Sequence, residues 1–424
     1  MFKPGALTGQ LLSIMISVLS IKAARDALPI MKNLPIVIAG GGIGGLATAL
    51  GLARKGLACI VLERAASLGE IGAGIQIGPN AFHCFDALGV GDEARACAVY
   101  IDSLRLMDAV DGEPIATIPL GDAFRQRFSN PYAVVHRADL HGVLLAACRA
   151  NALIELRTSH DVSGYLQQGD RLRVDCAGGE SIGASALIGA DGLHSNVRQQ
   201  LVDDGAPRVS GHTTYRSVIP SEKMPEELRW NAATLWAGPK CHIVHYPLKG
   251  WKLFNLVVTY HNDVTEAVAG VAVDKQEVQR GFEHIAPRAR QVIEIGEDWK
   301  LWVLCDRDPI LNWAEGRVAL LGDAAHPMLQ YFAQGACMAL EDAVCLAHMF
   351  ERHDNAVETA LDAYTRQRRV RTARVQLDSR LIGDYIYHPH GAAAEVRNHV
   401  MSGLSPEQWY DRLEWLYGGT GLDG

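Results

Sequence analysis

The sequence lacks the cysteine spacing that marks a disulfide framework or a structural zinc site. Nine cysteines are scattered over 424 residues, and no two of them stand in a C-x-x-C pair. An odd number of cysteines without such spacing is typical of proteins that work in a reducing compartment. We therefore predict a cytoplasmic protein without disulfides, and the histidines and cysteines predict no metal centre.

An excess of positive charge is also missing. The 40 Lys and Arg residues are outnumbered by 48 Asp and Glu residues, which gives a formal net charge of −8. Proteins that bind DNA or RNA depend on a basic surface that neutralises phosphates. Nucleic acid is therefore excluded as a partner.

Long apolar runs are missing as well. The run "LLSIMISVLSI" at 11–21 is shorter than the roughly 20 residues that a helix needs to cross a bilayer. Three interpretations of residues 1–30 stay open: a signal peptide, an interfacial anchor, or a dispensable extension ahead of Met31. The third is favoured because a nucleotide-binding strand, "LPIVIAGGG", follows at once. We expect no stable membrane insertion.

A glycine-rich turn between a strand and a helix is the first strong pattern that is present. The strand "IVIA" at 36–39 leads into Gly40, Gly42 and Gly45, which form G-x-G-x-x-G. Such glycines let the backbone and the helix N-terminus approach a pyrophosphate. Glu63 ends the next predicted strand, eighteen residues after Gly45, where a carboxylate accepts hydrogen bonds from ribose hydroxyls. The pattern predicts a dinucleotide site.

The pattern of apolar residues along the rest of the chain indicates one domain interrupted by another. Continuous apolar runs at 183–192 and 317–321 are typical of central parallel strands, whereas alternation between 211 and 305 predicts a mostly antiparallel sheet. The predicted fold is α/β, with a Rossmann-like, doubly wound parallel sheet, an inserted β-sheet domain for substrate, and a C-terminal helical segment. The predicted boundaries are 1–30 for the extension; 31–100, 130–210 and 306–348 for the nucleotide-binding domain; 101–129 and 211–305 for the substrate domain; and 349–424 for the helical region.

Two more predicted strands end in turns that contain Gly and Asp. Asp191 and Gly192 follow one strand, and Gly322 and Asp323 follow another. At the carboxyl edge of a doubly wound sheet, such turns face the ligand crevice. Carboxylates accept hydrogen bonds from hydroxyls, so two acidic turns suit an extended ligand with a polyhydroxyl chain. FAD has a ribitol that NAD lacks, and FAD is the predicted cofactor.

The motifs "GGGIGG", "GADGLHSNVR" and "GDAAHPMLQYFAQGACMALEDA" occur in this order. Together they resemble the group A flavoprotein aromatic hydroxylases, whose fold is that of para-hydroxybenzoate hydroxylase. The resemblance covers about residues 35 to 385. It implies an enzyme that binds FAD and has a small aromatic acid and O2 as substrates. The expected cosubstrate is NADH, and NADPH is the alternative. The sequence has no second G-x-G-x-x-G, as expected for this family, and a homodimer is left open.

The resemblance also implies roles around FAD. Glu63 and Arg64 would hold the adenosine end, and Arg137 of "VHRADLHGVL" would lie along the cofactor. Asp191 would serve both FAD and the nicotinamide step, and Asp323 would bind the ribitol.

The loop and helix after Asp323 have a physical logic of their own. A helix that begins around Gly335 would point the free N–H groups of Gly335 and Ala336 at the negative charge that reduced flavin carries near N1 and O2. Pro327 would stiffen the loop at the reactive face of the flavin. We expect His326 to be satisfied by local backbone. Cys337 stands where many family members have asparagine, which puts a side-chain contact with flavin in doubt.

The stretch "CHIVHYPL" at 241–248 predicts a strand on the substrate side. His242 and Tyr246 share one face of it and His245 faces the other, because side chains alternate along a strand. On a face that meets the flavin, His242 could take the proton of a phenol and Tyr246 could donate to a carboxylate. The pattern alone favours half-buried packing of two polar aromatic side chains on one strand face.

Within the family, "LRWNAATLWAGPKCHIVHYPLKGWKLFNLVVTYHND", "MLQYFAQGAC" and "WLYGGTGL" resemble the members that hydroxylate 3-hydroxybenzoate para to its hydroxyl group, forming gentisate. In them a histidine and a glutamine flank the phenol and a tyrosine lines the pocket. The matching residues, His242, Gln330 and Tyr246, are the predicted catalytic residues. Salicylate hydroxylases tend to carry proline in place of Gln330. A salicylate hydroxylase that forms catechol and a non-hydroxylating flavin reductase or oxidase are the alternatives.

Two patterns near the C-terminus have plainer interpretations. The stretch "YIYHPHG" at 385–391 holds histidines without a matching set of metal ligands, so it predicts a turn. A run of arginines is expected to form a solvated helix face or a subunit contact. These arginines are Arg366, Arg368, Arg369, Arg371, Arg374 and Arg380.

Overall fold

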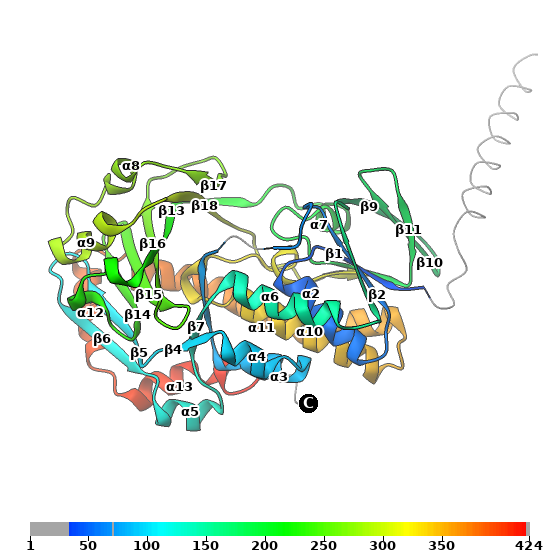
Figure 1. Cartoon of the computed structure of the whole chain (residues 1–424), viewed down its shortest axis with the longest axis horizontal. Coiled ribbons are helices and arrows are strands. Elements are labelled where there is room, and N and C mark those ends of the chain that lie inside the picture. The colour runs from blue at the N-terminus through cyan, green and yellow to red at the C-terminus, as the bar shows by residue number, and fades with distance from the viewer. Residues whose placement is uncertain (1–33, 70–71, 421–424) are drawn as a thin grey trace, which may run out of the picture.

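The computed structural model describes residues 34–69 and 72–420, so the predicted extension at 1–30 lies outside the described residues. Two lobes, each built around a sheet, lie side by side (Figure 1). The long helices α10 (Gly335–Arg352) and α11 (Val357–Ile382) run from one lobe toward the other. Within the described ranges, no helix has the length and apolar character to cross a membrane.

The first lobe is built on a six-stranded sheet with the order β19-β20-β12-β1-β2-β8. Five neighbouring strands are parallel, and β19 joins the edge antiparallel. Strand β1 has parallel neighbours on both sides, which confirms the predicted doubly wound sheet. Its strands are β1 (Ile36–Ala39), β2 (Cys59–Glu63), β8 (Ile154–Thr158), β12 (Ala186–Gly189), β19 (Ala314–Glu315) and β20 (Val318–Leu320).

Helices cover this sheet and bury its apolar strands in one core cluster. Helix α2 and helix α10 approach closely at Gly51, where an added Cβ would lie 3.1 Å from the carbonyl oxygen of Ala343. This close approach sets the direction in which the N-terminus of α10 points. The helices of the lobe are α2 (Ile43–Arg54), α3 (Pro79–Leu88), α4 (Gly91–Ala96), α6 (Arg137–Arg149) and α7 (Asn196–Leu201).

The second lobe contains an eight-stranded sheet with the order β17-β18-β13-β16-β15-β14-β5-β6. Its neighbours pair antiparallel except for β14 and β5, which are parallel, so the sheet is mostly antiparallel as predicted. The strands are β5 (Ser103–Asp108), β6 (Pro114–Pro119), β13 (Arg208–Pro220), β14 (Ala232–Gly238), β15 (Cys241–Leu248), β16 (Leu253–His261), β17 (Ala269–Ala272) and β18 (Lys300–Asp306). Two short helices, α8 (Lys275–Gln279) and α9 (Pro287–Ile295), pack beside it.

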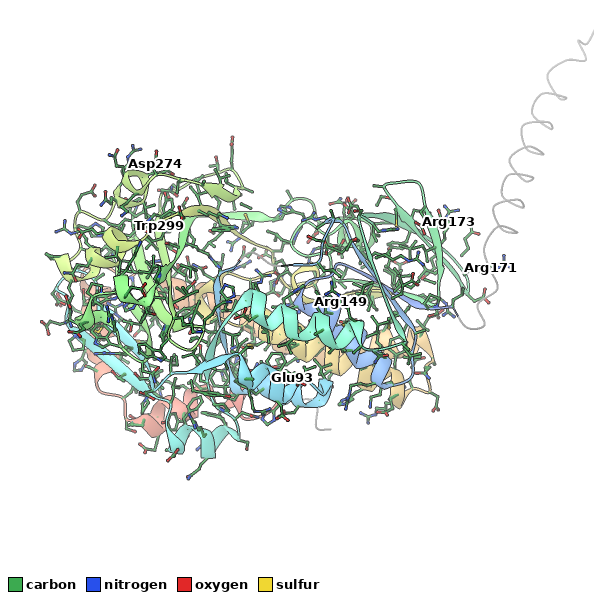
Figure 2. The ribbon with its side chains drawn as sticks, in the orientation of Figure 1. Glu93, Arg149, Arg171, Arg173, Asp274 and Trp299 are labelled. Atoms are coloured by element: carbon green, nitrogen blue, oxygen red, sulfur yellow. The ribbon has the colours of Figure 1, made fainter. Side chains whose placement is uncertain are left out.

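Two smaller sheets were not predicted. One has the order β11-β10-β9 and the other β3-β7-β4. The stretch 183–192, predicted as one strand, is divided at Ser185, where the chain passes from β11 to β12 in a different sheet. Figure 2 shows Arg171 and Arg173 of β10 at the outer edge of the first lobe. The strands are β3 (Gly74–Ile77), β4 (Ala98–Tyr100), β7 (Ala133–His136), β9 (Val162–Gln168), β10 (Arg171–Cys176) and β11 (Ser181–Ala184).

Helix α5 (Asp122–Phe128) lies within the predicted sheet segment 101–129. It buries Phe124 and Phe128 against Tyr410 and Tyr417 of α13 (Pro406–Tyr417). The C-terminal region is helical as predicted: a π-helical turn (Gly383–Tyr387) and α12 (Ala392–Ser402) connect α11 to α13. The domain boundaries themselves stay a proposal, and α10 runs across the one placed at 348.

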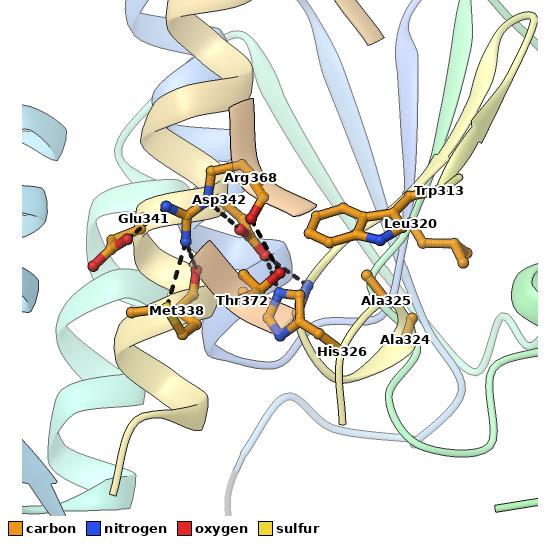
Figure 3. Close-up of polar contacts among 12 residues, drawn as sticks. Trp313, Leu320, Ala324, Ala325, His326, Met338, Glu341, Asp342, Arg368 and Thr372 are labelled. Carbon is orange, nitrogen blue, oxygen red and sulfur yellow. Dashed lines mark hydrogen bonds and ion pairs between the residues drawn. The ribbon is translucent and has the colours of Figure 1, made fainter. Parts of the chain in front are cut away.

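The arginine run on α11 does not form one solvated face. Arg368 is buried and forms ion pairs with Glu341 and Asp342 of α10, so the expectation was wrong for this residue (Figure 3). Arg366 is exposed and pairs with Asp362 on its own helix. The difference arises because α10 presents two carboxylates to one side of α11, and a buried carboxylate needs a charged partner.

Candidate active site

A cavity of about 380 Å³ lies where the two lobes meet. The first lobe lines it with the glycine turn after β1 and with the starts of α6 and α10, and the second lobe with one face of β15 and with β16. A second cavity, of about 310 Å³, lies against the end of β2 and the turn after β12. Gly42 and Gly192 line both cavities, so together they form one elongated groove.

The glycine turn has no room for side chains. Gly40 has φ +103°, and an added Cβ would lie 2.3 Å from the carbonyl oxygen of Ala190. A Cβ on Gly45 would lie 1.9 Å from the carbonyl oxygen of Gly40. The turn therefore brings the backbone of Gly42, at the N-terminus of α2, to the groove. This is the cradle that a pyrophosphate requires.

Glu63 and Arg64 line the second cavity, as the sequence predicts for the adenosine end. The two carboxylate oxygens of Glu63 accept hydrogen bonds from the backbone N–H groups of Gly41 and Ala65, both at 2.8 Å. These bonds hold the carboxylate at the end of β2. Each oxygen keeps a lone pair with which it can accept from a ribose hydroxyl.

Asp191 carries a buried oxygen that suits a ligand. Its Oδ2 accepts from the backbone N–H of Val197 at 3.3 Å, while Oδ1 is buried and has no partner among the described residues. Burial raises the pKa of this carboxyl. A buried oxygen without a partner is costly, so a hydroxyl or N–H of a bound dinucleotide would stabilise it. Asp191 lines the second cavity, and its role toward nicotinamide stays a prediction.

The ribitol side of the groove is formed by turns at the starts of two helices. Arg137, Asp323, Gly335 and Ala336 all line the first cavity. Asp323 is exposed to it, and Gly322 is fixed by a 3.1 Å hydrogen bond from its N–H to Oδ2 of a buried carboxylate on α10. Helix α10 begins at Gly335, so its unpaired N–H groups and positive dipole end face the cavity. These donors and acceptors fit FAD.

The structure changes the interpretation of the loop between Asp323 and Gly335. Pro327 is not among the residues that line the first cavity, and its buried carbonyl accepts from Nε2 of Gln376 at 3.1 Å. Met328, Leu329 and Gln330 line the cavity in its place. The bond to Gln376 fixes the carbonyl of Pro327 toward α11, and the predicted contact between Pro327 and the flavin stays a prediction.

His326 and Cys337 both turn away from the groove. His326 was expected to bond to local backbone, but its Nε2 lies 2.5 Å from Oδ2 of Asp342, and its side chain is fully buried (Figure 3). The expectation was wrong because α10 brings this carboxylate to the loop. Cys337 is also fully buried and does not line the cavity.

The substrate face of β15 is as the sequence predicts. His242 and Tyr246 line the first cavity, whereas His245 packs on the opposite face against Trp230 and Trp236. Burial, with smaller contributions from neighbouring histidines, lowers the pKa of His242 well below its usual value. The imidazole is neutral at pH 7 and can accept a proton. Burial raises the pKa of Tyr246, so its hydroxyl stays protonated and can donate.

Gln330 lines the cavity with its amide already engaged. Its Oε1 accepts from Nη2 of Arg216 at 2.9 Å, and its Nε2 donates to the hydroxyls of Thr214 and Thr259 at 3.1 and 3.2 Å. Both amide hydrogens are used, and Oε1 keeps one lone pair. The amide can therefore accept from a ligand, but it cannot donate without breaking one of these bonds.

Sequence reasoning missed Arg216. This residue lies on β13 and lines the first cavity. Burial lowers the pKa of its guanidinium, Arg137 adds to the effect, and no carboxylate in the described part of the chain pairs with it. A partly buried positive charge without a counterion attracts an anion. The signal in the sequence was one arginine in the alternating strand "TTYRSVIP".

Known proteins match the chain over most of its length. Residues 33–378 match the family model described as "FAD binding domain". The 3-hydroxybenzoate 6-hydroxylase 1 of Aquipseudomonas alcaligenes is 56% identical over 383 residues, which cover 90% of this chain and 97% of that protein. The 3-hydroxybenzoate 6-hydroxylase of Polaromonas naphthalenivorans is 50% identical, with 91% of this chain and 96% of that protein covered.

The fold also matches a solved structure. The crystal structure of Klebsiella pneumoniae HpxO complexed with FAD and uric acid has a TM-score of 0.79 and 25% identity, and covers 91% of this chain and 96% of that chain. The motifs, the groove and these relatives agree. The chain belongs to the FAD-dependent flavoprotein aromatic hydroxylases.

Proposed function

We propose that the chain hydroxylates 3-hydroxybenzoate at position 6, para to the hydroxyl group, and forms 2,5-dihydroxybenzoate (gentisate) with NADH and O2. The names of the two relatives support this substrate and this ring position. The observation that carries the proposal is that the first cavity presents a neutral histidine, His242, and the guanidinium of Arg216, which pairs with no carboxylate of residues 34–69 and 72–420. These groups are complementary to the phenol and the carboxylate of the substrate.

His242 would accept the phenolic proton. Its Nδ1 lies 2.8 Å from Nε2 of His388, which leaves Nε2 of His242 as the nitrogen that can accept. Removal of the proton raises the electron density of the ring carbon para to the oxygen, where the new bond forms. Bound FAD, once reduced by NADH, would supply activated oxygen to that carbon. A base of this kind typically contributes about 10² to 10⁴-fold to the rate.

Arg216 would bind the carboxylate. Gln330 holds the guanidinium through Oε1 and is itself held by two threonines, so it would orient Arg216 rather than contact the phenol as a donor. Tyr246 would donate its hydroxyl to the substrate. Arg216 on β13 and His242 on β15 are separated by strand β16, and this separation of cation and base favours a hydroxyl meta to the carboxylate. In salicylate the two groups are ortho, so the hydroxyl is already bonded to its own carboxylate.

The test is product analysis of the FAD-loaded enzyme with NADH or NADPH, O2 and one aromatic acid at a time. We expect gentisate from 3-hydroxybenzoate, formed in proportion to NADH consumed. Catechol from salicylate, with no gentisate from 3-hydroxybenzoate, would establish the decarboxylating alternative. Stoichiometric peroxide with every acid and no hydroxylated product would establish an oxidase. Faster product formation with NADPH would correct the cosubstrate alone.

A further inference from the structure

Three histidines from distant parts of the chain meet next to His242, on the face of the sheet that lines the first cavity. His212 comes from β13, His261 ends β16, and His388 follows the π-helical turn after α11. One ring nitrogen of each lies within 4.8 Å of the others. The sequence "YIYHPHG" was expected to lack matching ligands, but the fold supplies them from β13 and β16, far earlier in the chain.

Two of these histidines have a ring nitrogen that is not engaged in a hydrogen bond with another described residue. Nε2 of His388 is engaged with His242, while its Nδ1 is buried and has no partner among the residues described. Nδ1 of His212 is hydrogen-bonded to the hydroxyl of Tyr331, which leaves Nε2 of His212 for another contact. Histidines that bind metal use one nitrogen for the ion and the other for such an outer hydrogen bond. His212 and His388 both have this arrangement.

The charge state of the cluster also suits a cation. Burial and neighbouring histidines lower the pKa of His212 to about 4 and that of His388 to about 3, and burial lowers the pKa of His261. The three imidazoles are neutral at pH 7, which is the form that binds a metal. His261 is only partly buried, so an ion can enter from its side.

We propose that His212, His261 and His388 bind a divalent transition-metal ion of the class that prefers imidazole, such as Zn²⁺, and that the ion inhibits hydroxylation. Three imidazoles leave a fourth position for water. Tetrahedral zinc with Zn–N distances of about 2.0–2.1 Å places its nitrogens roughly 3.4 Å apart. The ring nitrogens lie within 4.8 Å of one another, so binding requires them to approach by roughly 1.4 Å at most.

The inhibition follows from the tautomers of two bonded histidines, and this part rests on the proposed function. For His242 to accept a proton at Nε2, its Nδ1 must carry hydrogen and donate to Nε2 of His388. A metal on Nδ1 of His388 requires hydrogen on Nε2 of the same ring. Two donors then face each other across the 2.8 Å contact. This repulsion is relieved when His242 adopts its other tautomer, which carries hydrogen on Nε2. His242 then cannot accept the phenolic proton.

Metal retention tests the site without reference to activity. The FAD-loaded enzyme is treated with a chelator, incubated with ZnCl2, dialysed, and assayed for zinc and flavin. We expect about one tightly held zinc per chain in the original protein and in His399→Ala, an exposed histidine outside the cluster. We expect loss of that zinc in His261→Ala and in His388→Asn, with flavin retained. Equal retention in all four proteins, or none in any, would overturn the site.

Gentisate formation in zinc-buffered solution tests the coupling. We expect zinc to suppress most hydroxylation in the original protein and in His399→Ala, and to leave His261→Ala at its own metal-free rate. Zinc held at the site with an unchanged rate would overturn the inhibition. The proposed function fails separately, when metal-free enzyme makes no gentisate from 3-hydroxybenzoate.

Discussion

Nη2 of Arg216 lies 2.9 Å from Oε1 of Gln330 on the wall of the first cavity. The partner is a neutral amide, so the guanidinium is held in place while its charge stays unbalanced. Arg216 lies on β13 and Gln330 in the 3-10 helical turn Gln330–Phe332, so the bond joins the antiparallel sheet to the loop that precedes α10. A carboxylate that enters the cavity meets an oriented cation.

Replacement of that cation should weaken substrate binding. For Arg216→Gln we expect the Kd of 3-hydroxybenzoate, measured by perturbation of the flavin spectrum, to rise roughly 30-fold or more, because loss of one partner of a buried charge pair costs about 2 kcal/mol or more. Arg208→Gln is the matched control on the same strand, since Arg208 pairs with Asp306 and does not line the cavity. Equal affinities in the two variants would remove Arg216 from carboxylate binding.

The absence of charge on Gln330 should matter more than the shape of its side chain. In Gln330→Glu a carboxylate would neutralise Arg216, and we expect weaker binding of 3-hydroxybenzoate than in Gln330→Met, which only removes the hydrogen bonds. The measurement is the same spectral titration on both variants. Tighter binding of 3-hydroxybenzoate in Gln330→Glu than in Gln330→Met would contradict the idea that the Arg216 charge must stay available for the substrate carboxylate.

His242→Ala should separate cofactor binding from chemistry. The variant should remain yellow, because His242 lies on the substrate face of the groove, and should lose about 10² to 10⁴-fold in gentisate formation. His399→Ala, exposed and outside the cavity, should form gentisate at the original rate. Unchanged hydroxylation in His242→Ala would exclude this residue as the base.

Acid should destabilise the fold below pH 6.5. Burial lowers the pKa of His242 well below 6.5, and lowers those of His245 and His388 to about 3. As pH falls below 6.5, the unfolded chain binds protons at these imidazoles and the folded chain does not. Stability present above pH 6.5 is therefore lost toward pH 3, by up to about 1.4 kcal/mol per pH unit for each.

The measurement is the midpoint of thermal unfolding between pH 7.5 and pH 5. His245→Phe, placed among Trp230, Trp236 and Phe254, should make the pH dependence shallower, whereas His399→Phe should leave it unchanged. A midpoint that is constant down to pH 5 would show that these histidines are not kept neutral by the fold.

The buried ion pairs of Arg368 should support both stability and the FAD loop. Arg368→Met leaves Glu341 and Asp342 without this partner, and we expect a loss of about 3–5 kcal/mol in the free energy of unfolding. Asp342 also binds the N–H of Gly322, so FAD content should fall too. Arg366→Met, which breaks an exposed pair on the same helix, should cost no more than about 1 kcal/mol. An equal loss in the free energy of unfolding in the two variants would contradict the view that burial makes the Arg368 ion pairs more important than the Arg366 pair.

Local sequence was sufficient where the feature depends on neighbours along the chain. The turn at Gly40 and the placement of His242 and Tyr246 on one strand face follow from backbone sterics and from the alternation of side chains. The start of α10 at Gly335 follows from the glycine after the loop. His242, Tyr246 and Gly335 line the first cavity and Gly40 lines the second, because strand ends and helix starts of a doubly wound sheet face one crevice.

Features that depend on contact between distant segments were mispredicted or missed. His326 meets Asp342, sixteen residues later, and Arg368 meets the same carboxylate from another helix. An arginine or histidine in a loop or helix has no local mark that tells whether a buried carboxylate will face it.

The sequence by itself determined the fold class, the cradle for a dinucleotide and the pair of polar residues on one strand, because each is set by spacing over a few residues. Only the tertiary structure decided that Arg216 faces the cavity without a counterion, that Gln330 holds it, and that His388 touches His242 across 146 residues. Those contacts arise when helices and sheets bury their apolar faces together, and burial then sets which charges need partners and which histidines stay neutral.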